Sequence, residues 1–230
     1  MLACSSRVLT AVCGRFNQTA SGEEVAEAFG LDEAPELAPR YNIAPTQPIA
    51  VVGVQPKTGR RGLASLTWGL VPRSSPGGER RLINARAETA WIKPAFREAL
   101  ARRRCLVPAT GFYEWQDTGE KKRQPWLVRL ASGRLFAFAG LWEPPAASGT
   151  APTCAILTTE PNEVARPIHD RMPVILDPAD YALWLDPAVI LPASVRPLLR
   201  PFPAEAMTAL RVTTAVNRPA FDDPSCLTPA

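Results

Sequence analysis

The chain has 230 residues, a formal net charge of +4 at pH 7 and 46% hydrophobic residues. This composition is typical of a soluble globular protein, and no apolar run is long enough to cross a membrane as a helix. The five cysteines are scattered and never form a CxxC pair, and there is a single histidine. A disulfide framework and a His-rich metal centre are therefore excluded, and we expect one domain in a reducing compartment, without metal or cofactor.

Helix signals are short and few. Ser21 has Glu24 three residues further on, which is the spacing of a capping box, and Gly30 closes the same segment. A second segment has Pro94 near its first position and ends in three arginines, which suit the helix dipole. The expected helices are residues 21–30, 93–104, 177–185 and 203–210.

Strand signals are more numerous. Runs rich in apolar, aromatic and β-branched residues, separated by turns with Gly or Pro, predict strands. They are residues 49–54, 63–70, 105–115, 125–130, 134–143, 153–159, 172–176 and 211–216. The polar stretch 116–124 predicts a hairpin between the third and fourth runs. Because strands outnumber helices without alternating with them, we predict an α+β domain with a largely antiparallel, barrel-like β-sheet and short peripheral helices.

The remaining segments define the expected domain limits. Residues 71–81 and 143–152 are expected to be exposed loops. We predict an N-terminal extension at residues 1–12, the domain at residues 13–222 and a flexible tail at residues 223–230.

Four short stretches place reactive residue types among apolar neighbours. They are VCGRF with Cys13, RLINARAET with Asn84, TGFYEW with Glu114 and RPIHDRMP with His169. Taken singly, each has an ordinary explanation: a buried cysteine, a turn-capping asparagine, a carboxylate on the solvent face of a strand, and a satisfied histidine. The alternative for Glu114 is an apolar pocket, which would raise its pKa into the range of acid–base chemistry.

Seven motifs occur in one order along the chain. They are CGRF at residues 13–16, RYNIAPTQ at 40–47, WGLVP at 68–72, LINARAET at 82–89, GFYEW at 111–115, AILTT at 155–159 and IHDRMPVIL at 168–176. In this order and spacing they resemble the SRAP family, the SOS response-associated peptidases that shield abasic sites, from Cys13 to about Phe221. The resemblance implies a single domain that binds single-stranded DNA and links covalently to abasic sites through an exposed N-terminal cysteine.

The resemblance also implies site residues. The implied catalytic residues are Cys13 as nucleophile, Asn84, Glu114 and His169. The implied DNA-binding residues are Arg15, Trp68, Arg86 and Thr158, the last of which lines the pocket. Relatives often have tryptophans just after residues 68–72, where this chain reads RSSPGG. A base-stacking wedge is therefore either missing or supplied elsewhere.

An N-terminal cysteine suits this reaction because its amine and thiol can add to the same aldehyde carbon of an opened abasic sugar and close a thiazolidine. With an α-amino pKa near 7.7–8.0, roughly a quarter of the amine is neutral at physiological pH, against about a thousandth of a lysine side chain. We expect Glu114 to move protons, Asn84 to orient the reacting atoms and His169 to assist β-elimination or reversal of the link. Arg15 and Arg86 are expected to pair with DNA phosphates.

The twelve residues before Cys13 conflict with this chemistry because they leave no free amine beside the thiol. Either the chain is cleaved between Val12 and Cys13, or translation starts at Val12, since a GTG codon can initiate with methionine. Two other functions stay open: a thiol peptidase, including one that acts only on its own N-terminus, and a non-covalent binder of single-stranded nucleic acid. The expected protein is a monomer of the bacterial cytoplasm, associated with the nucleoid, and its partner is single-stranded DNA with abasic sites.

Overall fold

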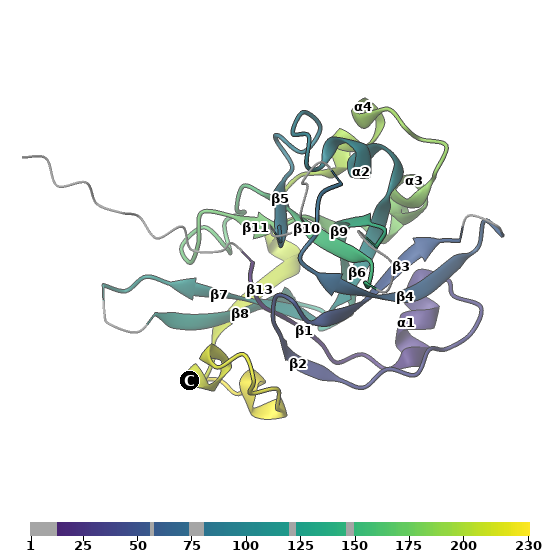
Figure 1. Ribbon diagram of the computed structural model, residues 1–230. Coiled ribbons are helices and arrows are strands. Elements are labelled where there is room, and N and C mark those ends of the chain that lie inside the picture. Colours follow the sequence, from purple (N-terminus) through teal and green to yellow (C-terminus); the bar gives the residue numbers. More distant parts are fainter. Residues whose placement is uncertain (1–12, 56–57, 74–80, 120–122, 146–149) are drawn as a thin grey trace, which may run out of the picture.

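The computed structural model describes residues 13–55, 58–73, 81–119, 123–145 and 150–230 (Figure 1). The predicted extension at residues 1–12 therefore lies outside the described residues. Strands build the centre of the molecule, and the short helices lie around it (Figure 1). No helix in the described part of the chain is long and apolar enough to cross a membrane.

One sheet has five strands, and every neighbouring pair in it is antiparallel. Its order is β13 (Met207–Arg211), β8 (Gln124–Leu130), β7 (Gly111–Gln116), β1 (Phe16–Gln18) and β2 (Arg40–Ile43). The β7–β8 pair confirms the predicted hairpin, although residues 120–122 of its connection are outside the described part.

The other sheet closes on itself. Its order is β11 (Met172–Pro173), β10 (Thr153–Thr159), β4 (Arg61–Trp68), β3 (Pro48–Val54), β6 (Arg104–Ala109), β9 (Phe136–Glu143) and β12 (Ile175–Leu176), with β5 (Asn84–Arg86) beside β10. Because β10 pairs with both β4 and β9, strands β10, β4, β3, β6 and β9 form a ring. Within the described sheets only the pairs β10–β4 and β10–β5 are parallel. The predicted α+β class with a barrel-like, largely antiparallel sheet is confirmed.

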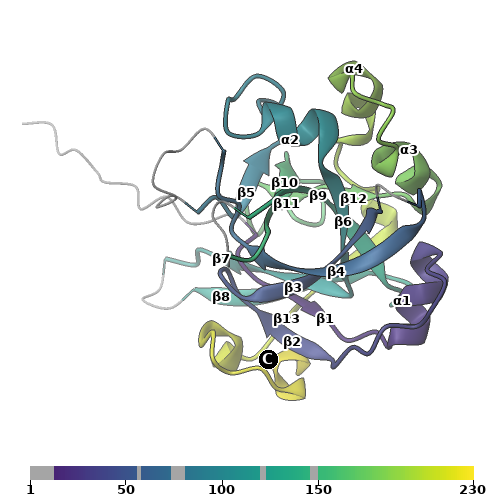
Figure 2. The same ribbon diagram turned by 45° about the vertical axis from the view of Figure 1, so that its right-hand side comes forward.

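Three predicted helices form, with shifted limits. Helix α1 (Gly22–Phe29) has the predicted capping box, and Gly30 ends it in the left-handed conformation. Helix α2 (Arg97–Arg102) is shorter than expected: residues 93–96 form turns, and the helix begins after Phe96. Residues 177–185 form a 3-10 turn followed by α3 (Tyr181–Leu185). A fourth helix, α4 (Pro192–Val195), was not predicted, and Figure 2 shows it with α2 and α3 at one end of the molecule.

Two predictions near the C-terminus are wrong. The expected helix at 203–210 is a 3-10 turn followed by β13, because this segment pairs with the edge of β8. The expected strand at 211–216 gives way to a 3-10 helix at Thr214–Asn217. The predicted tail at 223–230 contains a 3-10 helix capped by Asp223 and is mostly exposed, although Cys226 is fully buried and Pro229 bridges to Val212.

The predicted run at 105–115 is two strands. It divides at Thr110, whose amide donates to the Asn17 carbonyl, so that β6 and β7 belong to different sheets. The predicted loops at 71–81 and 143–152 are only partly described, and Val71 and Glu143 at their starts are buried.

The five-stranded sheet has a packed cluster on each face. Phe112 of β7 packs in the barrel-side cluster together with Cys13, Phe16 and Trp68. The next residue, Tyr113, packs on the other side in a small cluster with the C-terminal residues. Successive side chains of a strand point to opposite faces, and this alternation sends Glu114 to the same face as Phe112.

Candidate active site

Cys13 and Glu114 are in direct contact. The backbone nitrogen of Cys13 donates a hydrogen bond to Oε1 of Glu114 over 2.6 Å, although 101 positions separate the two residues. The contact follows from the pairing of β1 with β7, in which Phe16 lies opposite Phe112. Both side chains are buried, with 0% of Cys13 and 2% of Glu114 exposed.

The surroundings of Glu114 are apolar. Phe112 precedes it on the same face of β7, and Trp126 lies directly opposite it on β8. Burial raises the pKa of Glu114 to about 8; the hydrogen bond from Cys13 opposes this shift, and the charge of Asp170 adds to it. The carboxyl group therefore gains and loses its proton near neutral pH, which fits the apolar-pocket alternative and not the solvent-face one.

The Cys13 thiol is held in its protonated form. Burial raises its pKa well above the ordinary value, and the nearby Glu114 carboxylate raises it further. The Cys13 backbone has a φ of 43°, in the left-handed region that residues with side chains rarely adopt.

A second group of predicted residues lies at the edge of the other sheet. In the parallel pairing of β5 with β10, Asn84 lies opposite Ile156 and Arg86 lies opposite Thr158. Thr158 is buried, Asn84 is half-buried and Arg86 is exposed. The structure therefore brings these three predicted residues together, with one cation facing solvent.

His169 lies just before β11, next to this edge. Its Nδ1 accepts a hydrogen bond from the Arg171 backbone N–H over 3.1 Å, and Oδ1 of Asp170 lies 3.0 Å from the same nitrogen. Burial lowers the pKa of His169, and Asp170 only partly offsets the effect. The lowered pKa favours the neutral imidazole at physiological pH.

Arg171 was missed by the sequence analysis. Its guanidinium forms two hydrogen bonds to the Glu88 carboxylate, at 2.7 and 2.8 Å, and a third to the Thr158 carbonyl at 2.6 Å. It therefore ties the His169 turn to β10 and to the turn after β5. The only signal for it was its place in IHDRMPVIL, since a carboxylate partner 83 positions away cannot be read from sequence.

The two groups are connected across the barrel-side cluster. Nε2 of Gln116, two residues after Glu114, donates to the Pro167 carbonyl over 3.0 Å. Ile156 and Ile168 share a cluster with Cys13, and the charge of Asp170 acts on Glu114. The Cys13–Glu114 pair and the polar sheet edge therefore border the same apolar cluster.

Comparisons with known proteins identify the family of this chain. The family model described as SOS response associated peptidase (SRAP) matches residues 12–219. This chain belongs to the SRAP family. It is 39% identical over 224 residues to the abasic site processing protein YoqW of Bacillus subtilis, covering 94% of this chain and 99% of that protein. The abasic site processing protein YedK of Escherichia coli is 30% identical over 181 residues, covering 76% and 79%.

Solved structures also match. A crystal structure of a Bacteroides thetaiotaomicron protein superposes with a TM-score of 0.81 and 26% sequence identity, covering 95% of this chain and 100% of that one. The family and fold inferred from the seven motifs are thereby confirmed.

Two residues expected to contact DNA have buried side chains in this SRAP domain. Trp68 is 0% exposed, donates from Nε1 to the Ile83 carbonyl and packs edge-on against Phe16. Arg15 is 9% exposed, and its Nη1 donates to Oδ1 of Asn42 and to the Val216 carbonyl. Both side chains are therefore held by contacts within the domain.

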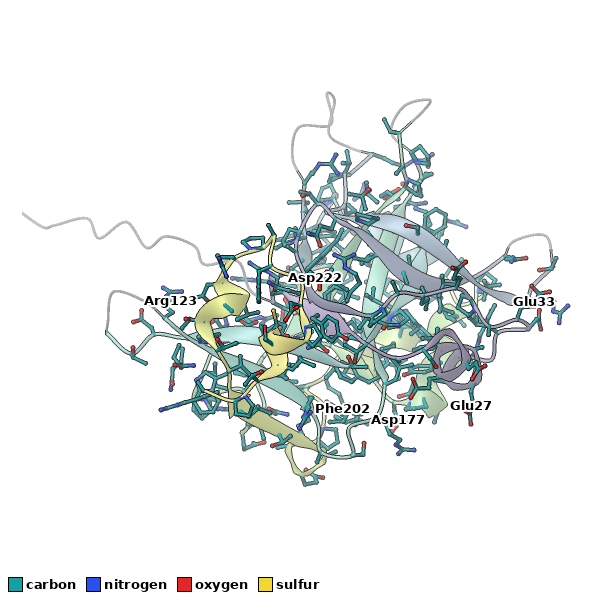
Figure 3. All side chains as sticks on the ribbon, turned by 90° about the horizontal axis from the view of Figure 1, so that it is seen from below. Glu27, Glu33, Arg123, Asp177, Phe202 and Asp222 are labelled. Atoms are coloured by element: carbon teal, nitrogen blue, oxygen red, sulfur yellow. The ribbon has the colours of Figure 1, made fainter. Side chains whose placement is uncertain are left out.

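A separate groove of about 890 Å³ lies away from these residues. Glu27, Asp177 and Phe202, labelled in Figure 3, line it, and none of the eight predicted site residues is among its described lining residues. Within the described residues, no group of three or more His, Cys, Asp or Glu side chains is placed to hold a metal.

Proposed function

We propose that this SRAP protein processes abasic sites in single-stranded DNA by forming a thiazolidine crosslink through Cys13 as its first residue. The observation that carries the proposal is the 2.6 Å contact between the Cys13 nitrogen and Glu114, whose pKa is about 8. A group with that pKa both donates and accepts protons at physiological pH. The names of the relatives as abasic site processing proteins support the same substrate.

The proposed reaction uses that contact directly. The Cys13 amine adds to the aldehyde carbon of the opened sugar, protonated Glu114 gives its proton to the hydroxyl that leaves as water, and the Glu114 carboxylate takes a proton back from the nitrogen to leave a neutral imine. The thiol sulfur then adds to the imine carbon, and its proton passes to the nitrogen. A five-membered ring forms with the net loss of one water. Because the thiolate is the nucleophile and the pKa of Cys13 is raised, the thiol has to lose its proton as the sulfur attacks.

The sheet edge supplies the remaining proposed roles. Asn84 orients the sugar, and neutral His169 acts on its 3′ side in β-elimination or reversal of the link. Arg86 is exposed at this edge and pairs with a DNA phosphate. We further propose that the protein works as a monomer in the bacterial cytoplasm, on single strands.

A gel assay tests the crosslink. Protein that begins at Cys13 is incubated with a single-stranded oligonucleotide carrying one abasic site, and heated without reductant. We expect a heat-stable adduct for the parent and none for Cys13→Ala. A parent that binds the oligonucleotide but never forms the adduct would identify a non-covalent binder instead.

Self-processing is a second candidate, favoured by the Cys13 backbone. In the full chain the Cys13 nitrogen belongs to the peptide bond with Val12, and its φ of 43° is strained. Attack of the Cys13 thiol on the Val12 carbonyl would transfer the acyl group to sulfur, while Glu114 protonates the departing nitrogen. Water would then hydrolyse the thioester, releasing residues 1–12 as an acid and freeing the amine.

Intact mass of the full chain over time tests this candidate. We expect loss of residues 1–12 in the parent, and retention in Cys13→Ala and Glu114→Gln. If the parent keeps its first twelve residues and no host protease removes them, initiation at Val12 becomes the source of the free amine.

A further inference from the structure

The outer face of the five-stranded sheet, opposite the reacting groups, is covered by a C-terminal segment (Figure 3). We call residues 216–222 the clasp. Asp222 belongs to it, and its carboxylate accepts from the backbone N–H groups of Tyr41 at 2.5 Å and Asn42 at 2.9 Å and pairs with Arg40. The clasp is thereby fixed along β2.

Two clasp contacts end on close chain neighbours of the reacting residues. Arg15, two positions after Cys13, donates from Nη1 to the Val216 carbonyl at 2.9 Å. Trp115, which follows Glu114 in β7, donates from Nε1 to Oδ1 of Asn217 at 2.6 Å. The Arg15 guanidinium also lies over the Trp115 ring, 5.6 Å from its centroid. One segment therefore contacts residues next to both reacting groups.

Asn42 completes the connection. It is fully buried, and its Nδ2 reaches the carbonyls of Val216, Arg218 and Phe221 at 3.2, 3.0 and 2.7 Å. Its Oδ1 accepts from Arg15 at 2.8 Å. Arg15 is a buried cation whose partners are neutral oxygens, and burial lowers its pKa. Groups buried in this way are costly to leave unpaired, so these hydrogen bonds hold Arg15 and Asn42 against the clasp.

The strand ladder does not reach Cys13. Strand β1 has three residues, with Phe16 opposite Phe112 and Asn17 opposite Gly111 in β7, and the last backbone bond toward Cys13 runs from the Tyr113 N–H to the Arg15 carbonyl at 2.9 Å. Cys13 lies two residues beyond that bond. The position of its nitrogen relative to Glu114 therefore depends on this bond and on the contacts that hold the side chains of Arg15 and Trp115 from the other face.

We propose that the clasp is a positioning element that holds the Cys13 nitrogen and the Glu114 carboxyl in reactive register from the opposite face of the sheet. Arg15 and Asn42 act as positioning residues in this arrangement and not as contacts to DNA. The proposal rests on the proposed function for its catalytic consequence, but its structural part is testable without DNA.

Single-turnover adduct formation tests the catalytic part, using chains that begin at Cys13. Asn42→Ala removes the centre of the network, and Asn217→Ala is a milder variant that removes only the acceptor for Trp115. Asn217→Asp restores that acceptor. Asp223→Ala is the matched control, because Asp223 caps the following 3-10 turn and its hydrogen bonds go to Ser225.

We expect the adduct rate to fall about tenfold for Asn42→Ala, equivalent to about 1.4 kcal/mol, and about threefold for Asn217→Ala. Asn217→Asp and Asp223→Ala should keep the parent rate. Affinity for the same oligonucleotide without a lesion should be unchanged throughout. An unchanged rate in Asn217→Ala, or equal losses of rate and affinity, would overturn the proposal.

Alkylation of thiols by iodoacetamide, read by peptide mass without DNA, separates this proposal from the function. We expect Asn217→Ala to speed labelling of Cys13 relative to the buried Cys105, and Asp223→Ala to leave the ratio unchanged. A parent that forms no adduct contradicts the function only. Equal labelling ratios in the parent and Asn217→Ala contradict the clasp.

Discussion

At the scale of single residues, Glu114 decides what the site can do. The sequence allowed two environments for its side chain, the solvent face of a strand or an apolar pocket. The residues beside it in the sequence are compatible with both. The choice is made by Trp126, which lies opposite Glu114 across the β7–β8 pair, and by the turn that places Cys13 against it. Neither contact can be predicted from the residues around Glu114, because both depend on strand register and on pairing between distant parts of the chain.

Replacing Glu114 should reveal its raised pKa as a pH-dependent stability. A carboxyl group with a folded pKa of about 8 costs nothing below its unfolded pKa and destabilises the fold increasingly as pH rises toward 8. We therefore expect Glu114→Gln to be more stabilising at pH 8 than at pH 5, by a difference on the order of 3 kcal/mol. Denaturant unfolding at both pH values measures this, and a pH-independent effect would contradict it.

Asp170 should influence both titrating groups. Its charge raises the pKa of Glu114 and also that of His169. We expect Asp170→Asn to lower both, whereas Asp32→Asn, which removes a carboxylate paired with Arg60, should change neither. His169 is the only histidine, so its ring protons give an unambiguous NMR titration. A His169 pKa that stays the same or rises in Asp170→Asn would count against this interaction.

At the scale of elements, local signals predict only part of the structure. The capping box and Gly30 define α1 almost to the residue, because a cap is made within one turn of chain. Strands β1, β2, β5 and β13 were missed because each is held by pairing with a neighbouring strand and not by its own residue pattern. The edge that carries Asn84 and Arg86 therefore came from the motif resemblance and not from strand propensity.

The first residue of α1, Gly22, has no room for a side chain. A Cβ on Gly22 would lie 1.8 Å from the Pro35 carbonyl oxygen, whereas one on Gly53 in β3 has no atom within 4 Å. We expect Gly22→Ala to lower the free energy of unfolding by about 1–3 kcal/mol. Gly53→Ala should change it by less than about 1 kcal/mol. Chemical denaturation of both variants compares them, and equal effects would contradict the packing described.

At the scale of the whole molecule, the order of seven motifs predicted the family, but not how distant segments cooperate. Ring closure through β10 and the packing of residues 223–230 both depend on contacts between remote parts of the chain. Motif resemblance also assigned Arg15 and Trp68 to a DNA surface, whereas the structure buries them. A shared motif identifies residues that the family retains in its pattern. Their burial in the structure is needed to distinguish a residue that packs inside the domain from one that is exposed to a ligand.

Arg86 is the exposed cation left at the site edge, and its role is measurable through salt. Each phosphate neutralised on a single strand adds about 0.7 to the slope of log affinity against log salt. We expect Arg86→Ala to weaken binding to single-stranded DNA and to reduce that slope by about this amount. Arg134→Ala, at an exposed turn lining the separate groove, is the control and should leave the slope unchanged.

The measurement that tests the central claim most directly is the intact mass of the adduct between Cys13-initiated protein and an abasic oligonucleotide, followed by peptide mapping. We predict a mass equal to the sum of the two reactants less one water, with the modification on Cys13 and no reductant required. The absence of an adduct, or an adduct that maps to another residue, would contradict the account.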